Sequence, residues 1–338
     1  MLPQFEGETA DEVWRQAATA LLTREDHLGQ SSRDGATREL LHCTFHIRDP
    51  RQRWVLSRQP PMNPAFAIAE VMWILQGRED AALLNFWNPA LPQFAGTGST
   101  YDGAYGHRLM VNFGLDQIER ACQALASKPD SRQIVLQLWD ASRDLPDHDG
   151  SPKSKDIPCN VCSLLKIRDG RLEWLQVMRS NDLYRGTPYN FVQFTTLQEV
   201  MAGCIGVDVG SYVQISDSLH LYEKNLSEIA VANQMPQEKN TDRLGLQWAD
   251  FKSVLAIFAS AIDELRAVSL VRNRLVHLVT DIDLPVAWHN LLLIVAADAA
   301  RRRGWTEEMQ MVSAKCSNPA LNWAWNGWVR RKGTVKDQ

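Results

Sequence analysis

The stretch DIPCNVCSLL, residues 156–165, holds two of the six cysteines of the chain, Cys159 and Cys162, three positions apart. A structural zinc site takes four ligands, usually two such pairs or one pair with histidines, and the sequence contains no second Cys-x-x-Cys pair. A redox pair normally opens a helix after a strand, whereas SLLKIRDG continues as a strand pattern. We therefore expect no metal site, and two buried apolar cysteines remain the simple interpretation.

The surroundings of Cys159 favour a different interpretation for that thiol. Alternation along a strand predicts that Cys159 and Cys162 point to opposite faces and do not act together. Twenty residues later, MRSNDLYRGTPYN (178–190) combines an arginine, a serine, an aspartate and two asparagines. A nearby cation favours the nucleophilic thiolate, and Arg179 could supply that charge and bind a phosphate with the same guanidinium. The pattern indicates a cysteine nucleophile.

Helix and strand patterns alternate over the first two thirds of the chain, and helices follow. Helices are expected at 10–22, 63–77, 114–126, 191–206, 249–269 and 286–304, strands at 40–50, 132–140 and 210–222, a polar turn at 29–40 and a loop at 88–106. Residues 162–180 predict a hairpin that turns at Asp169-Gly170. This order predicts an α/β domain over residues 1–240 and a helical C-terminal part over 241–338, which could pack on the same core.

Composition excludes several classes of protein. The formal net charge of −4 over 338 residues gives no general attraction to nucleic acid or to anionic membranes. The longest apolar run, residues 290–300, is too short to cross a bilayer, and the acidic N-terminus lacks a secretory pattern. Six cysteines in a chain of this length do not form a disulfide scaffold. We expect a cytoplasmic protein with neither nucleic acid nor membrane as partner.

Taken in order, several blocks resemble the folate-dependent thymidylate synthases and the related pyrimidine-nucleotide hydroxymethylases. The blocks are SSRDGATREL, AEVMWILQG, DGAYGHRL, PDSRQIVLQLWD, IPCN, RSNDLYRGTPYN and SDSLHLY, and they span roughly residues 28–225. Each block is short, but their joint order is specific. The resemblance implies a thymidylate synthase-like fold, with a mixed, largely antiparallel sheet flanked by helices. It also implies a homodimer in which the sheets of two subunits pack back to back.

The resemblance implies a reaction that begins when the Cys159 thiolate adds to C6 of a uracil base, which makes C5 nucleophilic. The one-carbon unit would come from 5,10-methylenetetrahydrofolate, so no metal is required. Glu70 would organise water for proton transfers. Asp182 would hold the folate pterin, Trp87 would pack near it, and Arg179 would act beside the nucleophile.

The same resemblance implies how a pyrimidine nucleotide monophosphate is held. The phosphate would be bound by Arg33, Arg179 and Ser180 of one subunit and by Arg132 donated across the dimer interface. Gln133 stands where the family has a further arginine, which removes one charge. His220 and Tyr222 would contact the ribose.

Asn190 is the residue that the resemblance assigns to the base. An amide can accept a hydrogen bond from N3–H and donate one to O4 of uracil. An aspartate at this position would suit cytosine better. The asparagine therefore indicates a uracil nucleotide.

Four departures from the synthases concern the product. Asn160 stands in the usual place of a histidine, Asn181 in the place of a common cysteine, and a second tryptophan after Trp87 is missing. The chain ends in WAWNGWVRRKGTVKDQ instead of a short apolar cap, and Trp323, Trp325 and Trp328 of this tail could supply a different lid. A dry site favours hydride transfer and a methyl product, whereas water gives a hydroxymethyl product. Both remain open, with the methyl product preferred because it is the commonest in the family.

Two further interpretations belong to other classes. RNRLVH, residues 272–277, fits an Arg-x4-His spacing of some helical ribonucleases, but it fits equally a basic helix surface with one histidine. A catalytically degenerate family member could instead bind a nucleotide or a partner without turnover. The joint retention of the site residues listed above speaks against a degenerate protein.

Overall fold

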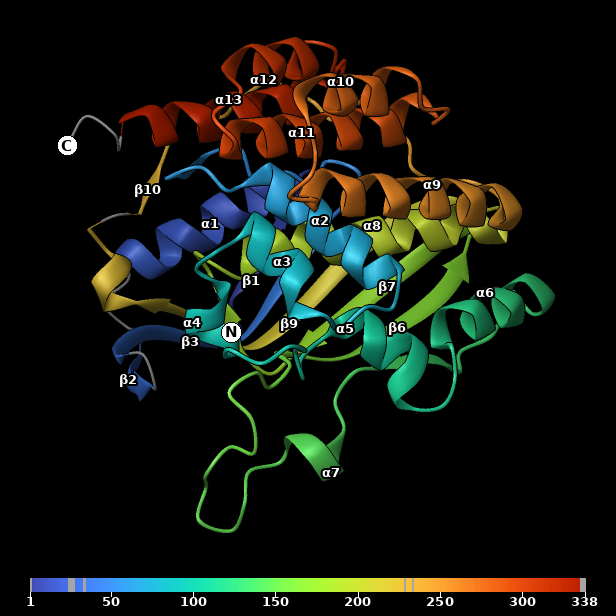
Figure 1. Ribbon diagram of the computed structural model, residues 1–338. Coiled ribbons are helices and arrows are strands. Elements are labelled where there is room, and N and C mark those ends of the chain that lie inside the picture. Colours follow the sequence, from blue (N-terminus) through green and yellow to red (C-terminus); the bar gives the residue numbers. More distant parts are fainter. Residues whose placement is uncertain (1, 24–27, 33–34, 228, 233, 335–338) are drawn as a thin grey trace.

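A mixed β-sheet forms the base of the molecule, and two layers of helices lie on one of its faces (Figure 1). The structure is a computed structural model that describes residues 2–23, 28–32, 35–227, 229–232 and 234–334. The sheet contains β1 (Gln4–Gly7), β2 (Leu28–Ser32), β3 (Gly35–Ile47), β5 (Ile134–Gln137), β6 (Asn160–Arg168), β7 (Arg171–Met178), β8 (Asn181–Asp182) and β9 (Asp208–Tyr222). Its strand order is β1-β3-β9-β7-β6-β5, with β2 beside β3 and β8 beside β9.

Antiparallel pairs outnumber parallel pairs in this sheet. β3 pairs antiparallel with β2 and β9, and β6 pairs antiparallel with β5 and β7. β1 with β3, β7 with β9, and β8 with β9 are parallel. The mixed, largely antiparallel sheet flanked by helices is confirmed.

The hairpin between β6 and β7 turns where the sequence predicts it. Asp169 and Gly170 have φ values of 49° and 71°, as a two-residue turn with positive φ at both positions requires. The polar turn expected at 29–40 is wrong, because β3 already begins at Gly35 and pairs with both β2 and β9. Pairing with β2 and β9 satisfies the hydrogen-bonding groups of the backbone there, so a polar segment forms a strand.

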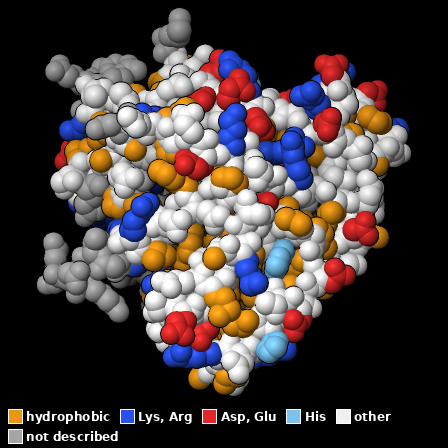
Figure 2. All heavy atoms as spheres, turned by 90° about the horizontal axis from the view of Figure 1, so that it is seen from above, with side chains coloured by type: hydrophobic (Ala, Val, Ile, Leu, Met, Phe, Trp, Pro, Cys, Tyr) orange, Lys and Arg blue, Asp and Glu red, His pale blue; other side chains and the backbone are white. Residues whose placement is uncertain are grey.

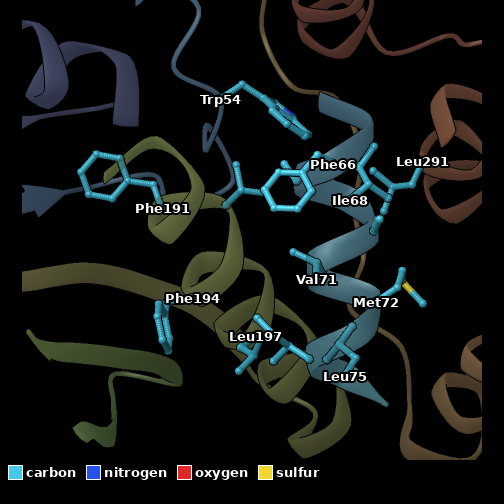
Figure 3. Close-up of a cluster of buried hydrophobic side chains, with 14 of the residues drawn as sticks. Trp54, Phe66, Ile68, Val71, Met72, Leu75, Phe191, Phe194, Leu197 and Leu291 are labelled. Atoms are coloured by element: carbon cyan, nitrogen blue, oxygen red, sulfur yellow. The ribbon is translucent and has the colours of Figure 1, made fainter. Parts of the chain in front are cut away.

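Three long helices cover the sheet: α1 (Ala10–Thr23), α2 (Pro64–Leu75) and α8 (Thr187–Ile205). The Asn63 side chain caps α2 by accepting from Phe66 N at 3.2 Å, and Pro64 occupies the first turn. Every residue of α2 except Glu70 is buried. Figure 3 shows why, because the side chains of α2 pack between those of α8 and a C-terminal helix.

The C-terminal helices form the outer layer (Figure 1). They are α9 (Trp248–Arg266), α10 (Arg272–Thr280), α11 (Val286–Arg302), α12 (Thr306–Ser313) and α13 (Pro319–Thr334). Buried residues of this layer belong to the same apolar cluster as those of the sheet domain. Trp325 and Trp328 are buried, so they contribute to the core and not to an open lid. The division into 1–240 and 241–338 stays a prediction.

Short elements connect these layers. They are β4 (Arg58–Gln59), α3 (Ala81–Trp87), α4 (Leu91–Ala95), α5 (Tyr105–His107), η1 (Arg108–Asn112), α6 (Gln117–Ser127), α7 (Ala141–Asp144), η2 (Glu223–Asn225) and β10 (Ala230–Val231). The outer face over the C-terminal helices carries acidic and basic side chains interspersed with apolar ones (Figure 2). Among the described residues, none of the helices is long and apolar enough to cross a membrane. The same residues contain no cluster of three side chains suited to a metal ion.

Candidate active site

Cys159 lies one residue before β6, at the end of the long segment that follows α7. Its carbonyl oxygen accepts a hydrogen bond from Arg179 N at 2.9 Å, which joins the start of β6 to the end of β7. The residue is half-buried. Cys159 is therefore fixed by a backbone hydrogen bond at the end of a central strand and remains partly accessible to solvent.

The predicted opposite orientation of Cys159 and Cys162 assumed unbroken alternation. The register between β6 and β7 shifts between Asn160 and Cys162, because Asn160 pairs with Met178 and Cys162 pairs with the preceding Val177. This bulge adds one residue to β6, so the two-residue period does not extend across it. Burial raises the pKa of the Cys162 thiol, which disfavours its thiolate.

Arg179 holds the chain that leads into Cys159. Its Nε donates to Pro158 O at 2.9 Å and its Nη2 donates to Ile157 O at 3.1 Å. Its guanidinium also lies 5.3 Å from the centre of the Trp139 ring. The arginine thus places its positive charge beside the segment of the nucleophile, and its role in binding phosphate stays a prediction.

Glu70 lies on the face of α2 that turns toward α8. Gln193 Nε2 donates to Glu70 Oε2 at 2.6 Å. Burial raises the pKa of Glu70 to about 7, the hydrogen bond from Gln193 opposes this, and the nearby Asp156 adds to it. A carboxyl group with this pKa exchanges protons near neutral pH, as a general acid or base must.

Tyr105 lies near both Glu70 and Cys159. Burial raises the pKa of the Tyr105 phenol well above its usual value, and Cys159, Asp156 and Glu70 are near enough to raise it further. Asp156 itself accepts from Gly103 N at 2.7 Å, and a Cβ on Gly103 would lie 2.8 Å from Asp156 Oδ1. Only glycine allows this close approach, which fixes the carboxylate beside the cluster.

A row of buried polar side chains runs from β9 to the predicted base-reading residue. Asn181 Nδ2 donates to Ser216 Oγ at 2.9 Å, and Asn190 Nδ2 donates to Asn181 Oδ1 at 3.2 Å. One N–H of Asn190 is therefore used inside the protein. Its carbonyl and its second N–H stay available for a base.

Asp182 and His220 are neighbours on paired strands. They are directly opposite in the β8–β9 register, and the His220 and Tyr222 rings stack edge to face at 5.4 Å. Asp182 Oδ1 accepts from Tyr184 N at 2.7 Å and Arg185 N at 2.9 Å. The structure therefore gathers the residues assigned to ribose and folate along one edge.

Three other predicted residues lie in different surroundings, and a fourth is not described. Arg132 is exposed on the turn before β5, where a partner subunit would have to receive it. Trp87 has 0% of its surface exposed, so it can lie only behind a ligand surface. Ser180 is half-buried between β7 and β8. Arg33 lies outside the described residues.

Sequence reasoning did not assign Asp156 or Gln193 a role. Asp156 stands three residues before Cys159. Gln193 follows Asn190 by three positions on a helix, which places both on one face. These spacings were usable signals, but nothing in the sequence indicated that Gln193 meets Glu70.

Two other places carry no predicted site residue. A pocket of about 530 Å³ lies between α6, α8 and α9, with Met110, Met201 and Trp248 in its wall. His277, from the ribonuclease-like spacing, is 65% exposed on α10 and lies 3.1 Å from Asp281. This arrangement suits a solvated helix surface.

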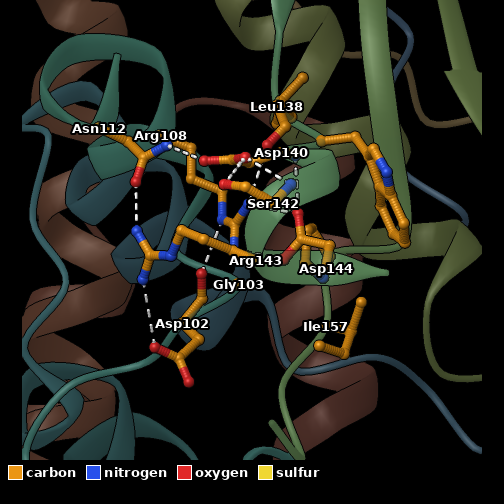
Figure 4. A network of polar contacts seen from close by, with 12 residues as sticks. Asp102, Gly103, Arg108, Asn112, Leu138, Asp140, Ser142, Arg143, Asp144 and Ile157 are labelled. Atoms are coloured by element: carbon orange, nitrogen blue, oxygen red, sulfur yellow. Dashed lines mark hydrogen bonds and ion pairs between the residues drawn. The ribbon is translucent and has the colours of Figure 1, made fainter. Parts of the chain in front are cut away.

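A buried ion pair supports the site from behind (Figure 4). Arg108 binds both carboxylate oxygens of Asp144, at 2.6 and 2.9 Å, and Arg108 Nη1 also donates to Leu138 O at 3.0 Å. Arg108 follows Tyr105 by three residues, and Asp144 precedes the segment that leads to Cys159. The pair therefore joins the helix that begins at Tyr105 to the segment between β5 and α7.

Replacing Glu70 with glutamine is expected to stabilise the protein at pH 8 and not at pH 4. Above pH 7 the Glu70 carboxyl is ionised in the folded and in the unfolded protein, and burial makes the ionised group unfavourable in the folded protein. Below about pH 4.5 the carboxyl is neutral in both states, so this penalty disappears. The full shift corresponds to about 3 kcal/mol, and partial solvent access reduces the expected gain in free energy of unfolding to about 2 kcal/mol. Urea denaturation at both pH values measures it. The exposed Glu307, changed to glutamine, is the control, and an equal gain there would contradict the explanation.

Comparison with known proteins agrees with this arrangement. The family model for thymidylate synthase matches residues 27–269, more than two thirds of the chain. A deoxyuridylate hydroxymethyltransferase of Bacillus phage SP01 is 33% identical over 229 residues, which are 64% of this chain and 58% of that protein. Proteins of the same name from Pseudomonas phage M6 and Delftia phage PhiW-14 are 35% identical over 189 residues and 27% identical over 263.

The alignments differ in how much they cover. The alignment with the Pseudomonas phage protein covers 55% of this chain and 52% of that protein. The alignment with the Delftia phage protein covers 73% of this chain and 71% of that protein. The chain thus spans little more than half the length of the first two relatives. The family match, however, covers both the nucleophile segment and the strands that carry it, and the chain belongs to the thymidylate synthase family.

Proposed function

We propose that this protein transfers a one-carbon unit to C5 of a deoxyuridylate-type nucleotide through a covalent bond from Cys159. The observation that carries the proposal is a buried carboxyl, Glu70, whose pKa burial raises to about 7, on a helix that covers the sheet from whose strand end the half-buried Cys159 projects; both residues are near enough to Tyr105 to raise the pKa of its phenol. A thiolate that adds to C6 turns C5 into an enolate carbon. The proton transfers that follow need an acid or base with a pKa near 7, which Glu70 has.

The surrounding residues support distinct tasks. Arg179 supplies a positive charge beside the nucleophile segment, and the amide of Asn190, oriented by Asn181, suits the N3–H and O4 of uracil. His220 and Tyr222 stand next to Asp182 at the edge where the ribose would lie. Arg33 and Ser180 remain proposed phosphate contacts.

The donor that fits this site is 5,10-methylenetetrahydrofolate, which supplies the one-carbon unit when bound. Asp182 fits it, because Asp182 Oδ1 is used by two backbone N–H groups and the half-exposed carboxylate keeps a second oxygen. That oxygen can accept hydrogen bonds from pterin N–H groups. Trp87, which is buried, would support the folate site from behind.

We also propose that two copies of the chain form a homodimer. Apolar side chains on the sheet face opposite the helices remain partly exposed: Leu164, Leu175, Val177, Val213 and Ile215. A sheet face of this composition needs a covering layer. A second copy packed on it would bring Arg132 toward the site of its partner.

Two products are consistent with this chemistry. The methyl product was preferred from the sequence because it is the commonest in the family. The specific observation for the hydroxymethyl product is that the phage relatives are named deoxyuridylate hydroxymethyltransferases. The mass of the product formed from deoxyuridylate separates the two by one oxygen atom.

The proposal is tested by intact mass after the protein is mixed with 5-fluoro-deoxyuridylate and the folate. We expect protein, nucleotide and folate in one covalent complex, because fluorine at C5 blocks the proton loss that normally follows. A protein that stays at its own mass under these conditions would contradict the proposal.

Replacing Asn190 with aspartate is expected to lower kcat/KM for deoxyuridylate by about 10- to 100-fold. A carboxylate accepts from N3–H but has no donor for O4, so it suits cytosine, whose N4 group is a donor. Steady-state kinetics with deoxyuridylate and deoxycytidylate measure both values. The ratio of the two is an internal control, since a general loss of folding leaves it unchanged, and an unchanged ratio would remove Asn190 from base recognition.

A further inference from the structure

A row of polar side chains runs inside the protein from the middle of β9 to the base-reading amide. Its members are almost fully buried: Tyr212, Gln214 and Ser216 are 0% exposed, Asn181 is 1% exposed and Asn190 is 6% exposed. Tyr212, Gln214 and Ser216 lie on one face of β9, because every second residue of a strand points the same way. Burying a polar side chain costs free energy unless it is hydrogen-bonded, so the pairing within this row decides how its amides are oriented.

The orientation of the Asn181 amide follows from its partners on β9. Tyr212 Oη donates to Gln214 Oε1 at 2.9 Å, and Gln214 Nε2 donates to Ser216 Oγ at 3.3 Å. Asn181 Nδ2 donates to the same serine oxygen at 2.9 Å. Ser216 Oγ thus accepts from two N–H groups, which matches the two lone pairs of a hydroxyl oxygen. Because the nitrogen of Asn181 is directed to Ser216, its side-chain oxygen is directed to the other side, where Asn190 lies.

The side-chain oxygen of Asn181 determines which way the Asn190 amide faces. Asn190 Nδ2 donates to Asn181 Oδ1 at 3.2 Å. If the Asn190 amide turned by 180°, its own oxygen would face Asn181 Oδ1, and two oxygens without a hydrogen between them repel each other. An unsatisfied buried polar group makes such an orientation less populated by about 10- to 100-fold. Asn190 therefore presents its oxygen and its second N–H to a ligand in a fixed order.

This order matters because uracil and cytosine need opposite orders. Uracil offers an N3–H donor beside the O4 acceptor, whereas cytosine offers the N3 acceptor beside the N4 amino donor. An amide can pair with either base, but only in one of two orientations that differ by 180°. An asparagine that turns freely would therefore accept both bases. The orientation in which Asn181 holds Asn190 is the one that matches uracil.

We infer that Asn181, held by Ser216, makes the protein select uracil over cytosine nucleotides by fixing the orientation of the Asn190 amide. This inference rests on the proposed function, because it takes Asn190 as the residue that pairs with the base. The identity of residue 190 alone does not provide the selectivity, since a free amide pairs with both bases. The selectivity comes from two buried side chains that lie behind it.

Asn181 and Ser216 are positioning residues, because they act on the nucleotide through Asn190. Asn181 is also one of the four departures from the synthases, which commonly have a cysteine at this position. A thiol is a weak donor and a weak acceptor, so it does not join Ser216 to Asn190 as the amide does. The departure at residue 181 thus has a consequence for the choice of base.

The test compares the wild-type chain with Asn181→Leu, a substitution of similar size that removes both hydrogen-bonding groups. Isothermal titration calorimetry gives the dissociation constants of deoxyuridylate and deoxycytidylate without folate, so no reaction contributes. We expect the wild-type chain to bind deoxyuridylate about 10- to 100-fold more tightly than deoxycytidylate. In Asn181→Leu the two constants should become similar. Affinity for deoxyuridylate should fall only about twofold, because half of the molecules still hold the matching orientation.

Ser216→Ala is the second test variant, and Thr195→Val is the matched control. Ser216→Ala removes the oxygen that holds Asn181 Nδ2, so the same loss of selectivity is expected, and this variant decides if Asn181→Leu does not fold. Thr195 is 0% exposed on the helix that carries Asn190, but its hydroxyl donates to Phe191 O at 2.6 Å within that helix. An equal loss of selectivity in Thr195→Val would show a general packing effect and overturn the inference.

The remaining results separate this inference from the proposed function. A folded Asn181→Leu protein with the selectivity of the wild-type chain overturns the inference, and so does a wild-type chain that binds deoxycytidylate at least as tightly as deoxyuridylate. Both results leave one-carbon transfer through Cys159 intact, provided that 5-fluoro-deoxyuridylate forms its covalent complex. If that complex does not form while Asn181→Leu loses its selectivity, the proposed reaction is wrong and the inference stands. A wild-type chain that binds neither nucleotide contradicts both.

Discussion

The Cys159→Ser protein is expected to form no covalent complex with 5-fluoro-deoxyuridylate and the folate, and to turn over deoxyuridylate about 10⁴-fold more slowly or worse. A serine hydroxyl is far less acidic than a thiol, and the charge of Arg179 beside the segment does not ionise it. Without addition at C6, C5 stays unreactive. Intact mass and steady-state kinetics measure the two effects.

Cys162→Ser is the natural control for this experiment. Cys162 is three residues away and, like Cys159, half-buried, but burial raises the pKa of its thiol. We expect this variant to keep the covalent complex and most of its turnover. If the covalent complex survives in Cys159→Ser and disappears in Cys162→Ser, the nucleophile is Cys162 and the proposed assignment to Cys159 is wrong.

The Asp144→Ala protein is expected to lose about 3–5 kcal/mol of its free energy of unfolding. Asp144 is the carboxylate partner of Arg108, and the two side chains are 1% and 2% exposed. Removing the carboxylate leaves a buried guanidinium without a counter-charge, which is much more costly than losing an exposed pair. Since a folded domain is stable by about 5–15 kcal/mol, urea denaturation should show a large shift of the midpoint.

Arg143→Ala is the control, because Arg143 lies next to Asp144 in the same network (Figure 4). It is 46% exposed and lies 3.5 Å from Asp102, which is 50% exposed, so its loss should change stability by no more than about 1 kcal/mol. The double variant Asp144→Leu with Arg108→Met should recover part of the loss, since no charge is then buried alone. Equal effects in Asp144→Ala and Arg143→Ala would contradict a structural role for the buried pair.

Most long elements follow from local patterns in the sequence. The α2 helix is delimited by Asn63 and Gly77, and the Asp169-Gly170 turn sets the register of its hairpin. The α/β order and the helical C-terminal part follow from the same kind of pattern. These features depend on neighbouring residues along the chain, so one sequence is enough to predict them.

Some expectations failed because distant contacts override local preference. The segment 29–40 is polar, yet β9 and β2 hold its second half as a strand. The register shift between Asn160 and Cys162 depends on how β6 pairs with β7, and local alternation does not predict it. Trp87, which the sequence predicts near the cofactor, is fully buried, a depth that its position in the sequence does not predict. The spacing of a few residues predicts neither how two strands pair nor how deeply a side chain is buried.

By itself, the sequence determined which residues are candidates for the chemistry: Cys159, Glu70, Arg179 and Asn190, each within its own block. Only the tertiary structure decided that Glu70 accepts a hydrogen bond from Gln193 and that Tyr105 lies near both Glu70 and Cys159. The reason is physical. The identity of a side chain defines what it can do, but its pKa and its free hydrogen-bonding groups depend on burial and on neighbours that lie far away along the chain.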